Sequence, residues 1–208
     1  MKMDKRSIIE QYHANRRDYG RLVGEVERIL NESIERHGIK IHALTSRIKE
    51  IDSLLDKAQR KGISKPFEQI HDLIGFRIVC LFLSELDEIS DIIKEEFDVF
   101  EEDDKVNASE MQIFGYMSLH IKARLKYSGN IQSNRESAST PFEIQVRTIA
   151  QDAWASVSHH LDYKEISAVP ESLKRDFYAL SGLFYVADTH FSILQKAKLA
   201  KLARKVIT

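Results

Sequence analysis

The sequence predicts a single α/β domain in which helices flank a mixed, largely antiparallel sheet of about five strands. Three features of the chain lead to this prediction. A long stretch with helical periodicity opens it, short apolar or alternating runs fill its middle, and two further helical stretches close it. With 208 residues, of which 43% are hydrophobic, the chain can bury one core of ordinary size. This order of elements is typical of a mixed sheet covered by helices.

The N-terminal part predicts a long helix, a short strand and a second helix. Over residues 4–37, apolar side chains recur at three- and four-residue steps. Gly38 then supplies a stop, because glycine readily takes the left-handed conformation that ends helices. Residues 39–43 alternate apolar and polar side chains, as in a half-buried strand. A threonine or serine at the start of the segment 45–61 is expected to cap the second helix.

The rest of the chain alternates strands and helices without a repeat or a long linker. A continuous apolar run from Phe76 is long enough for a central strand. Later strands show period-two alternation, and turn-forming residues separate them. The expected elements after the central strand are a helix over Glu85–Glu96 capped by Ser84, a strand over Phe97–Glu101, a loop over 102–113, a strand over Leu119–Leu125, a connection over 127–140, a strand over Phe142–Val146, and helices over roughly 149–163 and 170–198.

Composition and charge restrict the class of protein. The charged residues nearly cancel to a net charge of −1, so contact with nucleic acid or membrane would need a local basic patch. The single cysteine, Cys80, lies in an apolar run and is expected to be a core residue, since it cannot close an internal disulfide. No stretch approaches the ~20 apolar residues of a bilayer span, and no signal-type apolar core follows the N-terminus. We therefore expect a cytoplasmic protein without membrane contact.

Phosphate-binding side chains are expected on the second helix, which also holds Arg47. Lys49, Ser53 and Lys57 are spaced by four residues, so they would lie on one face of that helix. Two ammonium groups and a hydroxyl supply donors to anionic phosphate oxygens. A lysine-rich helix face that is simply solvated has the same pattern, and spacing alone leaves both interpretations open.

An acidic residue, Asp72, enters the central strand and is followed by Gly75 and Arg77. A carboxylate suits Mg²⁺, which prefers one or two such ligands together with phosphate oxygens and water. A guanidinium can stack on a base or neutralise phosphate. The alternative is a capping aspartate and a surface arginine. The preceding His71 does not indicate a metal-dependent phosphohydrolase, because such a site needs several further histidine and aspartate ligands.

Two later strands carry aromatic and polar candidates. Gly115 before Tyr116 would let the aromatic ring lie against a flat ligand such as a base. A tyrosine that covers the sheet edge is the alternative. Strand periodicity sends Glu143, Gln145 and Arg147 to one face. An ordered row of acid, amide and cation opposite a buried face favours a site, with cross-strand charge pairing as the alternative.

The order of these motifs along the chain identifies them better than any one of them alone. Over roughly residues 40–165, the chain resembles the synthetase domain of the RelA/SpoT family. The motifs that carry the resemblance are Arg47-Ile48-Lys49 with Ser53 and Lys57, then Asp72-Leu73-Ile74-Gly75-Phe76-Arg77, then Gly115-Tyr116-Met117-Ser118-Leu119-His120, and then Glu143-Ile144-Gln145-Val146-Arg147-Thr148 with Trp154-Ala155, His159 and Tyr163-Lys164.

This resemblance implies a nucleotidyltransferase-like fold and a GTP pyrophosphokinase (an ATP:GTP 3′-diphosphotransferase). Such an enzyme moves the β,γ-pyrophosphate of ATP to the 3′ hydroxyl of GDP or GTP and makes guanosine tetra- and pentaphosphate, the alarmones of the stringent response. It also implies that Asp72 and Glu143 are catalytic and hold Mg²⁺, and that Glu143 assists deprotonation of the attacking hydroxyl. The other implied roles are ATP binding by Arg47, Lys49, Ser53, Lys57 and Arg77, and acceptor binding by Tyr116, His120, Gln145 and Arg147.

The acceptor side departs from the family pattern. A lysine that many members offer to the acceptor phosphates has no counterpart here beyond Lys105, and Met117 stands where a basic or amide residue is common. The donor side is intact, so the departure bears on the acceptor more than on the reaction type. One alternative is a toxin-like member that transfers pyrophosphate to the 3′ end of tRNA. Another is a catalytically silent module that binds nucleotide.

The expected organisation is one synthetase domain over residues 1–208. It consists of an N-terminal helix (1–38), a catalytic core (39–165) and a C-terminal helical segment (166–208). ATP and GDP or GTP are the expected partners, and tRNA belongs to the alternative. Whether the chain forms a homo-oligomer is left open.

Overall fold

The computed structural model describes residues 4–104, 118–126, 139–161 and 169–206. Within them, five strands form one sheet in the order β1-β2-β5-β4-β3. The strands are β1 (Ala43–Ile48), β2 (Ile74–Cys80), β3 (Phe97–Asp104), β4 (Leu119–Leu125) and β5 (Phe142–Thr148). β2 and β5 run parallel, and the other neighbours pair antiparallel. The predicted mixed, largely antiparallel sheet of about five strands is confirmed.

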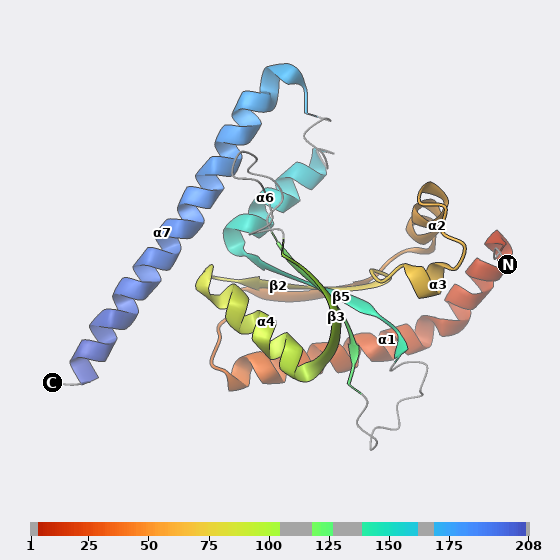
Figure 1. The fold of residues 1–208 in the computed structure, drawn as a ribbon, viewed down its shortest axis with the longest axis horizontal. Coiled ribbons are helices and arrows are strands. Elements are labelled where there is room, and N and C mark those ends of the chain that lie inside the picture. The colour runs from red at the N-terminus through yellow and green to blue at the C-terminus, as the bar shows by residue number, and fades with distance from the viewer. Residues whose placement is uncertain (1–3, 105–117, 127–138, 162–168, 207–208) are drawn as a thin grey trace.

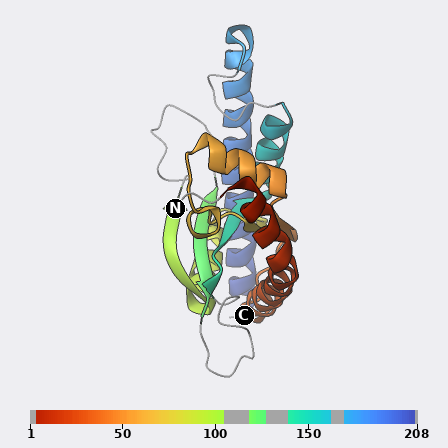
Figure 2. The ribbon, with the colours of Figure 1, turned by 90° about the vertical axis from the view of Figure 1, so that its right-hand side faces the viewer.

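Helices lie on both sides of this sheet (Figure 1). They are α1 (Lys5–Arg36), α2 (Ile51–Arg60), α3 (Pro66–Gln69), α4 (Ser84–Glu96), α6 (Ile149–His160) and α7 (Lys174–Val206), and a short 3₁₀ turn, η2 (Glu171–Leu173), precedes α7. Figure 1 shows α1 and α4 on one side of the sheet and α2 and α6 on the other. Figure 2 shows that α7 extends well beyond the sheet.

Side chains from α1, α4 and one face of the sheet form the hydrophobic core. Tyr12 and Leu30 of α1 and Ile93 of α4 are buried together with Phe76 and Ile144 of the strands. Burying one such side chain fully contributes roughly 1.5–3 kcal/mol. Because successive strand residues point to opposite faces, the other face of the same strands is polar. The core therefore fixes the sheet and leaves a polar face on which a site can form.

The chain between α1 and α2 departs from the prediction. The strand lies at 43–48 rather than 39–43, and α2 begins at Ile51 rather than near residue 45. Residues 43–48 pair with the backbone of β2 along their whole length. The threonine and serine that were expected to start a helix therefore lie in an edge strand of the sheet. The prediction that Lys49 lies on the same helix face as Ser53 and Lys57 is therefore wrong.

Two smaller predictions also need correction. Ser84 does not cap α4 from outside. It is the first residue of the helix, and Leu83 stands at the N-cap without a side-chain hydrogen bond. β3 continues to Asp104, so the expected loop over 102–113 begins later than predicted, and most of its residues lie outside the described part of the chain. Of the helices in the described part, none is both long and apolar enough to cross a membrane.

Candidate active site

Asp72, just before β2, is the meeting point of three elements. Its Oδ2 atom lies 2.6 Å from Nζ of Lys49, which follows β1, and 2.7 Å from Nζ of Lys57 on α2. The backbone carbonyl of Lys49 accepts a hydrogen bond of 3.1 Å from the hydroxyl of Tyr12, so α1 helps to fix the backbone of Lys49. The two lysines expected to act together do come together, although they reach Asp72 from different elements.

The charges around Asp72 leave an excess of positive charge. Burial would raise the pKa of Asp72, but the hydrogen bonds from Lys49 and Lys57 outweigh it and hold the pKa below its usual value. Burial lowers the pKa of Lys49, and this outweighs the hydrogen bond and charge of Asp72, which act in the opposite sense; the charges of Lys57 and Arg47 add smaller lowering effects. One carboxylate is therefore paired with two ammonium groups, and the guanidinium of Arg47 lines the same cavity. Such a place favours an anion with several negative charges, such as a nucleotide triphosphate.

Asp72 and Glu143 line the same cavity, which has a volume of about 190 Å³. The fold brings them to the same cavity, because Gly75 of β2 lies beside Glu143 of β5 and Asp72 lies two residues before β2. The other side chains that line this cavity are those of Thr45, Ser46, Arg47, Phe76, Arg77 and Gln145.

The carboxylates of Asp72 and Glu143 fit a magnesium site whose remaining ligands come from substrate phosphates and water. The Oδ1 atom of Asp72 is buried and has no hydrogen-bond partner in the described part of the chain, which leaves one ligand oxygen available. Among the described residues, no group of three or more histidine, cysteine, aspartate or glutamate side chains could hold a metal by itself. Mg²⁺ commonly takes one or two protein carboxylates and completes its shell with phosphate oxygens and water.

A row of hydrogen bonds runs along β5 from Glu143. Gln145 donates to Oε2 of Glu143 over 3.1 Å, and Arg147 donates to Oε1 of Gln145 over 2.9 Å. This confirms that the three side chains share one face. On β4, Nδ1 of His120 lies 3.0 Å from Oε1 of Glu143, and its Nε2 lies 2.7 Å from Oγ of Ser118. When Nδ1 donates to Glu143, a neutral imidazole accepts the Ser118 hydroxyl at Nε2.

The environment of Glu143 keeps it ionised at neutral pH. Burial would raise the pKa of Glu143, but the hydrogen bond and charge of His120 and the hydrogen bond from Gln145 outweigh burial. The net effect lowers this pKa, while the negative charge of Asp72 opposes the shift. The carboxylate is therefore both charged and oriented before any substrate arrives.

Asp152 on α6 was missed by the sequence analysis, and it holds two arginines. Its Oδ1 atom lies 3.3 Å from Nη1 of Arg77 and 3.5 Å from Nη1 of Arg147. Burial and the charge of Arg77 lower the pKa of Arg147 to about 10, while Asp152 opposes that shift. The signal available in the sequence was an acidic residue in the first turn of a helix that directly follows an arginine-bearing strand.

A second cavity of about 390 Å³ adjoins the first, and three arginines line it. It shares Arg47, Arg77 and Gln145 with the smaller cavity. Its remaining lining residues are Arg147, Ala155, Ser156, His159 and His160. Arg47 and Arg77 therefore stand at the boundary between the carboxylate-bearing cavity and the arginine-rich one.

The junction of β5 and α6 is fixed by a capping box and by α7. Thr148 accepts a hydrogen bond from the backbone of Gln151, and the Gln151 side chain accepts one from the Thr148 backbone. The Thr148 hydroxyl donates to Oδ2 of Asp188 on α7 over 2.6 Å. Burial raises the pKa of Asp188 to about 6, although this hydrogen bond acts against the shift. Because Asp152 lies in the first turn of α6, this junction sets where it stands.

The structure gives less information on the other predicted site residues. Ser53 is exposed on α2, one turn before Lys57. Tyr116 lies outside the described residues, as do Lys105, Met117, Tyr163 and Lys164, so the expected stacking on the acceptor base remains a prediction.

Two basic residues of β4, Lys122 and Arg124, already have partners in the structure. Nζ of Lys122 lies 2.5 Å from Oε1 of Glu101. Arg124 donates to the backbone oxygen of Ser139 over 3.2 Å, and its guanidinium lies 4.2 Å from the centroid of the Phe100 ring. They share a strand face with His120.

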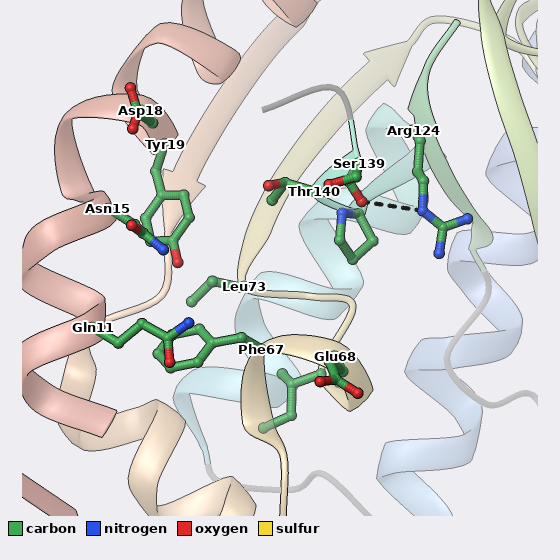
Figure 3. A pocket seen from close by; sticks show the side chains of 12 residues that line it. Gln11, Asn15, Asp18, Tyr19, Phe67, Glu68, Leu73, Arg124, Ser139 and Thr140 are labelled. Atoms are coloured by element: carbon green, nitrogen blue, oxygen red, sulfur yellow. Dashed lines mark hydrogen bonds between the residues drawn. The ribbon is translucent and has the colours of Figure 1, made fainter. Parts of the chain in front are cut away.

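Figure 3 shows a separate cavity of about 350 Å³ between α1, α3 and the start of β5. Tyr19, Phe67 and Leu73 form part of its wall, and Arg124 closes one side through its bond to Ser139. Neither Asp72 nor Glu143 lines it. Its size does not make it the candidate site, because it lacks the paired carboxylates and the lysines.

Comparison with known proteins identifies the family. Residues 46–168 match the family described as a region found in RelA / SpoT proteins. The chain is 34% identical over 147 residues to the GTP pyrophosphokinase YwaC of Bacillus subtilis (strain 168). The aligned segment covers 69% of this chain and 68% of that protein. The chain therefore belongs to the RelA/SpoT family.

Two solved structures share the fold. The small alarmone synthetase 1 from Bacillus subtilis has a TM-score of 0.75 at 23% identity, with coverage of 92% of this chain and 99% of that chain. A structure of small alarmone synthetase 1 bound to its product pppGpp has a TM-score of 0.71 at 24% identity, with coverage of 91% and 99%. The expected RelA/SpoT-type synthetase fold is confirmed.

Proposed function

We propose that this chain is a GTP pyrophosphokinase, which transfers the β,γ-pyrophosphate of ATP to the 3′ hydroxyl of GDP or GTP and so makes guanosine tetra- or pentaphosphate. The observation that carries the proposal is one cavity lined by Asp72 and Glu143, with Lys49 and Lys57 held on Asp72. A curated relative is named GTP pyrophosphokinase, and a structural neighbour holds its product pppGpp. We assign the catalytic core to residues 39–165 and place the protein in the cytoplasm.

The donor half binds ATP through cations. Lys49 and Lys57, with Ser53 one turn away, would contact the phosphates, since charge-assisted hydrogen bonds to phosphate are strong. Arg47 and Arg77, at the boundary of the two cavities, would lie against the adenine faces. Asp72 and Glu143 would hold Mg²⁺, which neutralises charge that develops on the transferred group.

The acceptor half orients a hydroxyl and receives its proton. The 3′ oxygen forms a bond to the β-phosphorus of ATP while that phosphorus loses its bond to the bridging oxygen, and AMP leaves with that oxygen. The hydroxyl proton passes to Glu143. Because the pKa of Glu143 is lowered, it is a weak base, and we infer that the proton moves late, as the new bond forms.

The remaining side chains would position the acceptor nucleotide. Tyr116 would stack on the guanine, while His120 and Gln145 hold Glu143 in place beside the ribose. Arg147, ordered by Asp152 and Gln145, would contribute positive charge to acceptor binding. These roles rest on the resemblance for Tyr116 and on hydrogen-bond geometry for the other three.

The test is an acceptor competition. The protein is incubated with Mg²⁺ and ATP labelled at the γ-phosphate, together with GDP, GTP or bulk tRNA, and the product that carries label is identified. We expect label on GDP or GTP and none with the Glu143→Gln variant. Label on tRNA alone would replace the proposed acceptor, and nucleotide binding without any transfer would support a silent binding module.

A further inference from the structure

Tyr12 of α1 is a core residue whose hydroxyl group reaches the donor half of the site. Its ring is fully buried in the hydrophobic core. Its hydroxyl donates a hydrogen bond of 3.1 Å to the backbone carbonyl of Lys49, a residue 37 positions away in the sequence. The N-terminal half of α1 lies at the same end of the molecule as α2 (Figures 1 and 2). The fold thus joins a core tyrosine to the lysine whose ammonium group is held on Asp72.

The direction of this hydrogen bond follows from the groups that make it. A carbonyl oxygen can only accept, so the tyrosine supplies the proton. Burial raises the pKa of Tyr12 above its ordinary value, so the hydroxyl keeps its proton at neutral pH. Nη1 of Arg16 lies 3.5 Å from the same hydroxyl oxygen and donates to it. The hydroxyl therefore accepts from Arg16 and has its own proton for the carbonyl of Lys49.

Lys49 lies in the short connection between β1 and α2, which consists of this residue and Glu50. The backbone N–H of Lys49 donates to the carbonyl of Leu73 over 2.8 Å. Glu50 is the N-cap of α2, but its side chain makes no capping hydrogen bond. The backbone of Lys49 is therefore held at both polar groups, at its N–H by Leu73 and at its carbonyl by Tyr12.

A fixed backbone matters at this position because a lysine side chain is long and flexible. Ordering such a side chain on a ligand costs rotamer entropy, and the cost falls when the groups around it are arranged beforehand. The ammonium group of Lys49 already lies 2.6 Å from Asp72, beside the cavity that the carboxylates line. The same connection sets where α2 begins, and α2 carries Lys57, the second lysine on Asp72.

We propose that Tyr12 is a positioning residue for ATP binding: its hydroxyl holds the backbone of Lys49 so that the ammonium group of Lys49 meets the ATP phosphates. This role rests on the proposed function, because it takes ATP as the anion that Lys49 contacts. Tyr12 lines neither cavity of the site, so it acts through Lys49 rather than on the substrate. Residues 46–168, which match the family, begin after α1, so the donor half draws on a helix outside the matched region.

The ring of Tyr12 also packs in the core, and two variants separate packing from the hydroxyl. Tyr12→Phe keeps the ring and removes only the hydroxyl. Tyr19→Phe is the matched control, because Tyr19 lies on the same helix, is 5% exposed, and has its ring centroid 6.2 Å from that of Tyr12. The Tyr19 hydroxyl bonds to Asn15, and its residue lines the separate cavity of Figure 3 rather than the site.

The first measurement is ATP affinity by calorimetry, together with the KM for each substrate. Tyr12→Phe should raise the ATP dissociation constant and the KM for ATP by roughly twofold to tenfold, the range that one neutral hydrogen bond contributes. The KM for GDP should stay near the wild-type value, because Lys49 belongs to the donor half. Tyr19→Phe should leave both KM values unchanged. Wild-type ATP affinity in Tyr12→Phe, or equal losses in the two variants, would overturn the role of the hydroxyl.

A double-mutant cycle tests whether Tyr12 acts through Lys49. Lys49→Met removes the ammonium group but keeps the backbone carbonyl that accepts from Tyr12. In that background the hydroxyl has no ammonium group to position, so adding Tyr12→Phe should weaken ATP binding no further. If Tyr12→Phe costs as much ATP affinity in Lys49→Met as in the wild type, the hydroxyl acts by another route and the proposal is wrong.

Hydrogen exchange tests the support of Lys49 without any nucleotide. The amide proton of Lys49 is bonded to the carbonyl of Leu73, and loosening the connection should speed its exchange with deuterated solvent. We expect faster exchange at Lys49 in Tyr12→Phe and the wild-type rate in Tyr19→Phe. Equal rates in all three proteins would contradict the proposal. A wild type that binds no ATP would overturn the proposed function instead, and faster exchange would then still support the hold of Tyr12 on Lys49.

Discussion

Asp72 and Glu143 line the same cavity and are mostly buried, with side chains 19% and 13% exposed, yet their neighbours differ in charge. Asp72 is held by two ammonium groups at 2.6 and 2.7 Å. Glu143 is held by an imidazole nitrogen and an amide. Both carboxyl groups have a lowered pKa. Asp72 owes this to the hydrogen bonds and charges of two lysines, and Glu143 owes it to the hydrogen bond and charge of His120 and to the hydrogen bond from the neutral amide of Gln145.

This difference indicates how each half of the site responds to substrate. When phosphate oxygens arrive, Lys49 and Lys57 can turn from Asp72 toward them and free Asp72 for a metal ion. The partners of Glu143 have no such reason to move, because neither carries a fixed charge that phosphate would attract. We infer that the donor half exchanges partners on binding, whereas the acceptor half is already arranged. Three predictions test this contrast, and a fourth extends the comparison to another buried carboxyl group, that of Asp188.

The largest effect is expected from Glu143→Gln. The amide keeps the shape and can still bond His120 and Gln145, but it can neither accept the hydroxyl proton nor bind metal as a carboxylate. Turnover should fall at least by roughly 10²–10⁴-fold, the usual contribution of a general base. ATP binding, measured by calorimetry, should change little. Turnover within tenfold of wild type would remove Glu143 from the chemistry.

A large but different effect is expected from Asp72→Asn. The change leaves Lys49 and Lys57 without their counter-charge, so ATP without Mg²⁺ should bind as well as before or better. Turnover should nevertheless fall by about 100-fold or more, because a metal ligand is lost. The comparison of ATP affinity with and without Mg²⁺ separates this variant from Glu143→Gln. If both variants lose ATP affinity equally, the inference that Asp72 acts in the donor half and Glu143 in the acceptor half is wrong.

An intermediate effect is expected from Lys57→Ala. Loss of a charge-assisted contact to phosphate, worth about 1.5–3 kcal/mol, should weaken ATP binding by roughly 10- to 100-fold while acceptor affinity stays near wild type. Arg60→Ala is the matched control, since Arg60 lies on the same helix, is exposed, and lines neither cavity of the site. Equal losses for the two variants would mean that the overall charge of α2 matters rather than contact with phosphate.

Much of the fold could be predicted because its elements have strong local patterns. The periodicity of residues 4–37 predicted α1 almost to its ends. The alternation in Leu119–Leu125 predicted β4 with its correct bounds. The segment 43–48 was misplaced because a threonine and a serine suit a helix cap as well as a strand, and only pairing with β2 decides between them. That pairing is a contact between distant parts of the chain, which local patterns do not contain.

Some site residues were predicted from a correct local pattern and others from an incorrect one. The row Glu143, Gln145 and Arg147 followed from strand periodicity, and its hydrogen bonds agree. Lys49 was predicted to act with Lys57 from one helix face. That placement is wrong because Lys49 precedes α2, yet both ammonium groups reach Asp72, and their joint role in ATP binding stays a prediction. Asp152 and Asp188 were missed. Their partners are brought to them by the turn from β5 into α6 and by the return of α7, and no spacing in the sequence encodes either contact.

The smallest effect concerns Asp188, a third buried carboxyl group, whose one hydrogen-bonded neighbour in the described chain is the Thr148 hydroxyl. Burial raises its pKa to about 6, and the hydrogen bond from Thr148 offsets this only in part. The folded protein therefore holds this proton more tightly than the unfolded chain, so stability falls as pH rises from about 4 to about 6. Asp72 and Glu143 act in the opposite sense, but only below about pH 4, because their pKa values are lowered.

The range from pH 5 to pH 7 therefore isolates Asp188. Asp188→Asn keeps an oxygen for the Thr148 hydroxyl but cannot titrate. The wild type should gain about 1 kcal/mol more than the variant on going from pH 7 to pH 5, a relative difference in Tm of roughly 2–4 °C for a chain of this size. All other titratable groups are common to both proteins, so their contributions cancel in the comparison. Parallel Tm curves for the two proteins would show that Asp188 is not protonated in this range, and that a single hydroxyl suffices to keep a buried carboxylate charged.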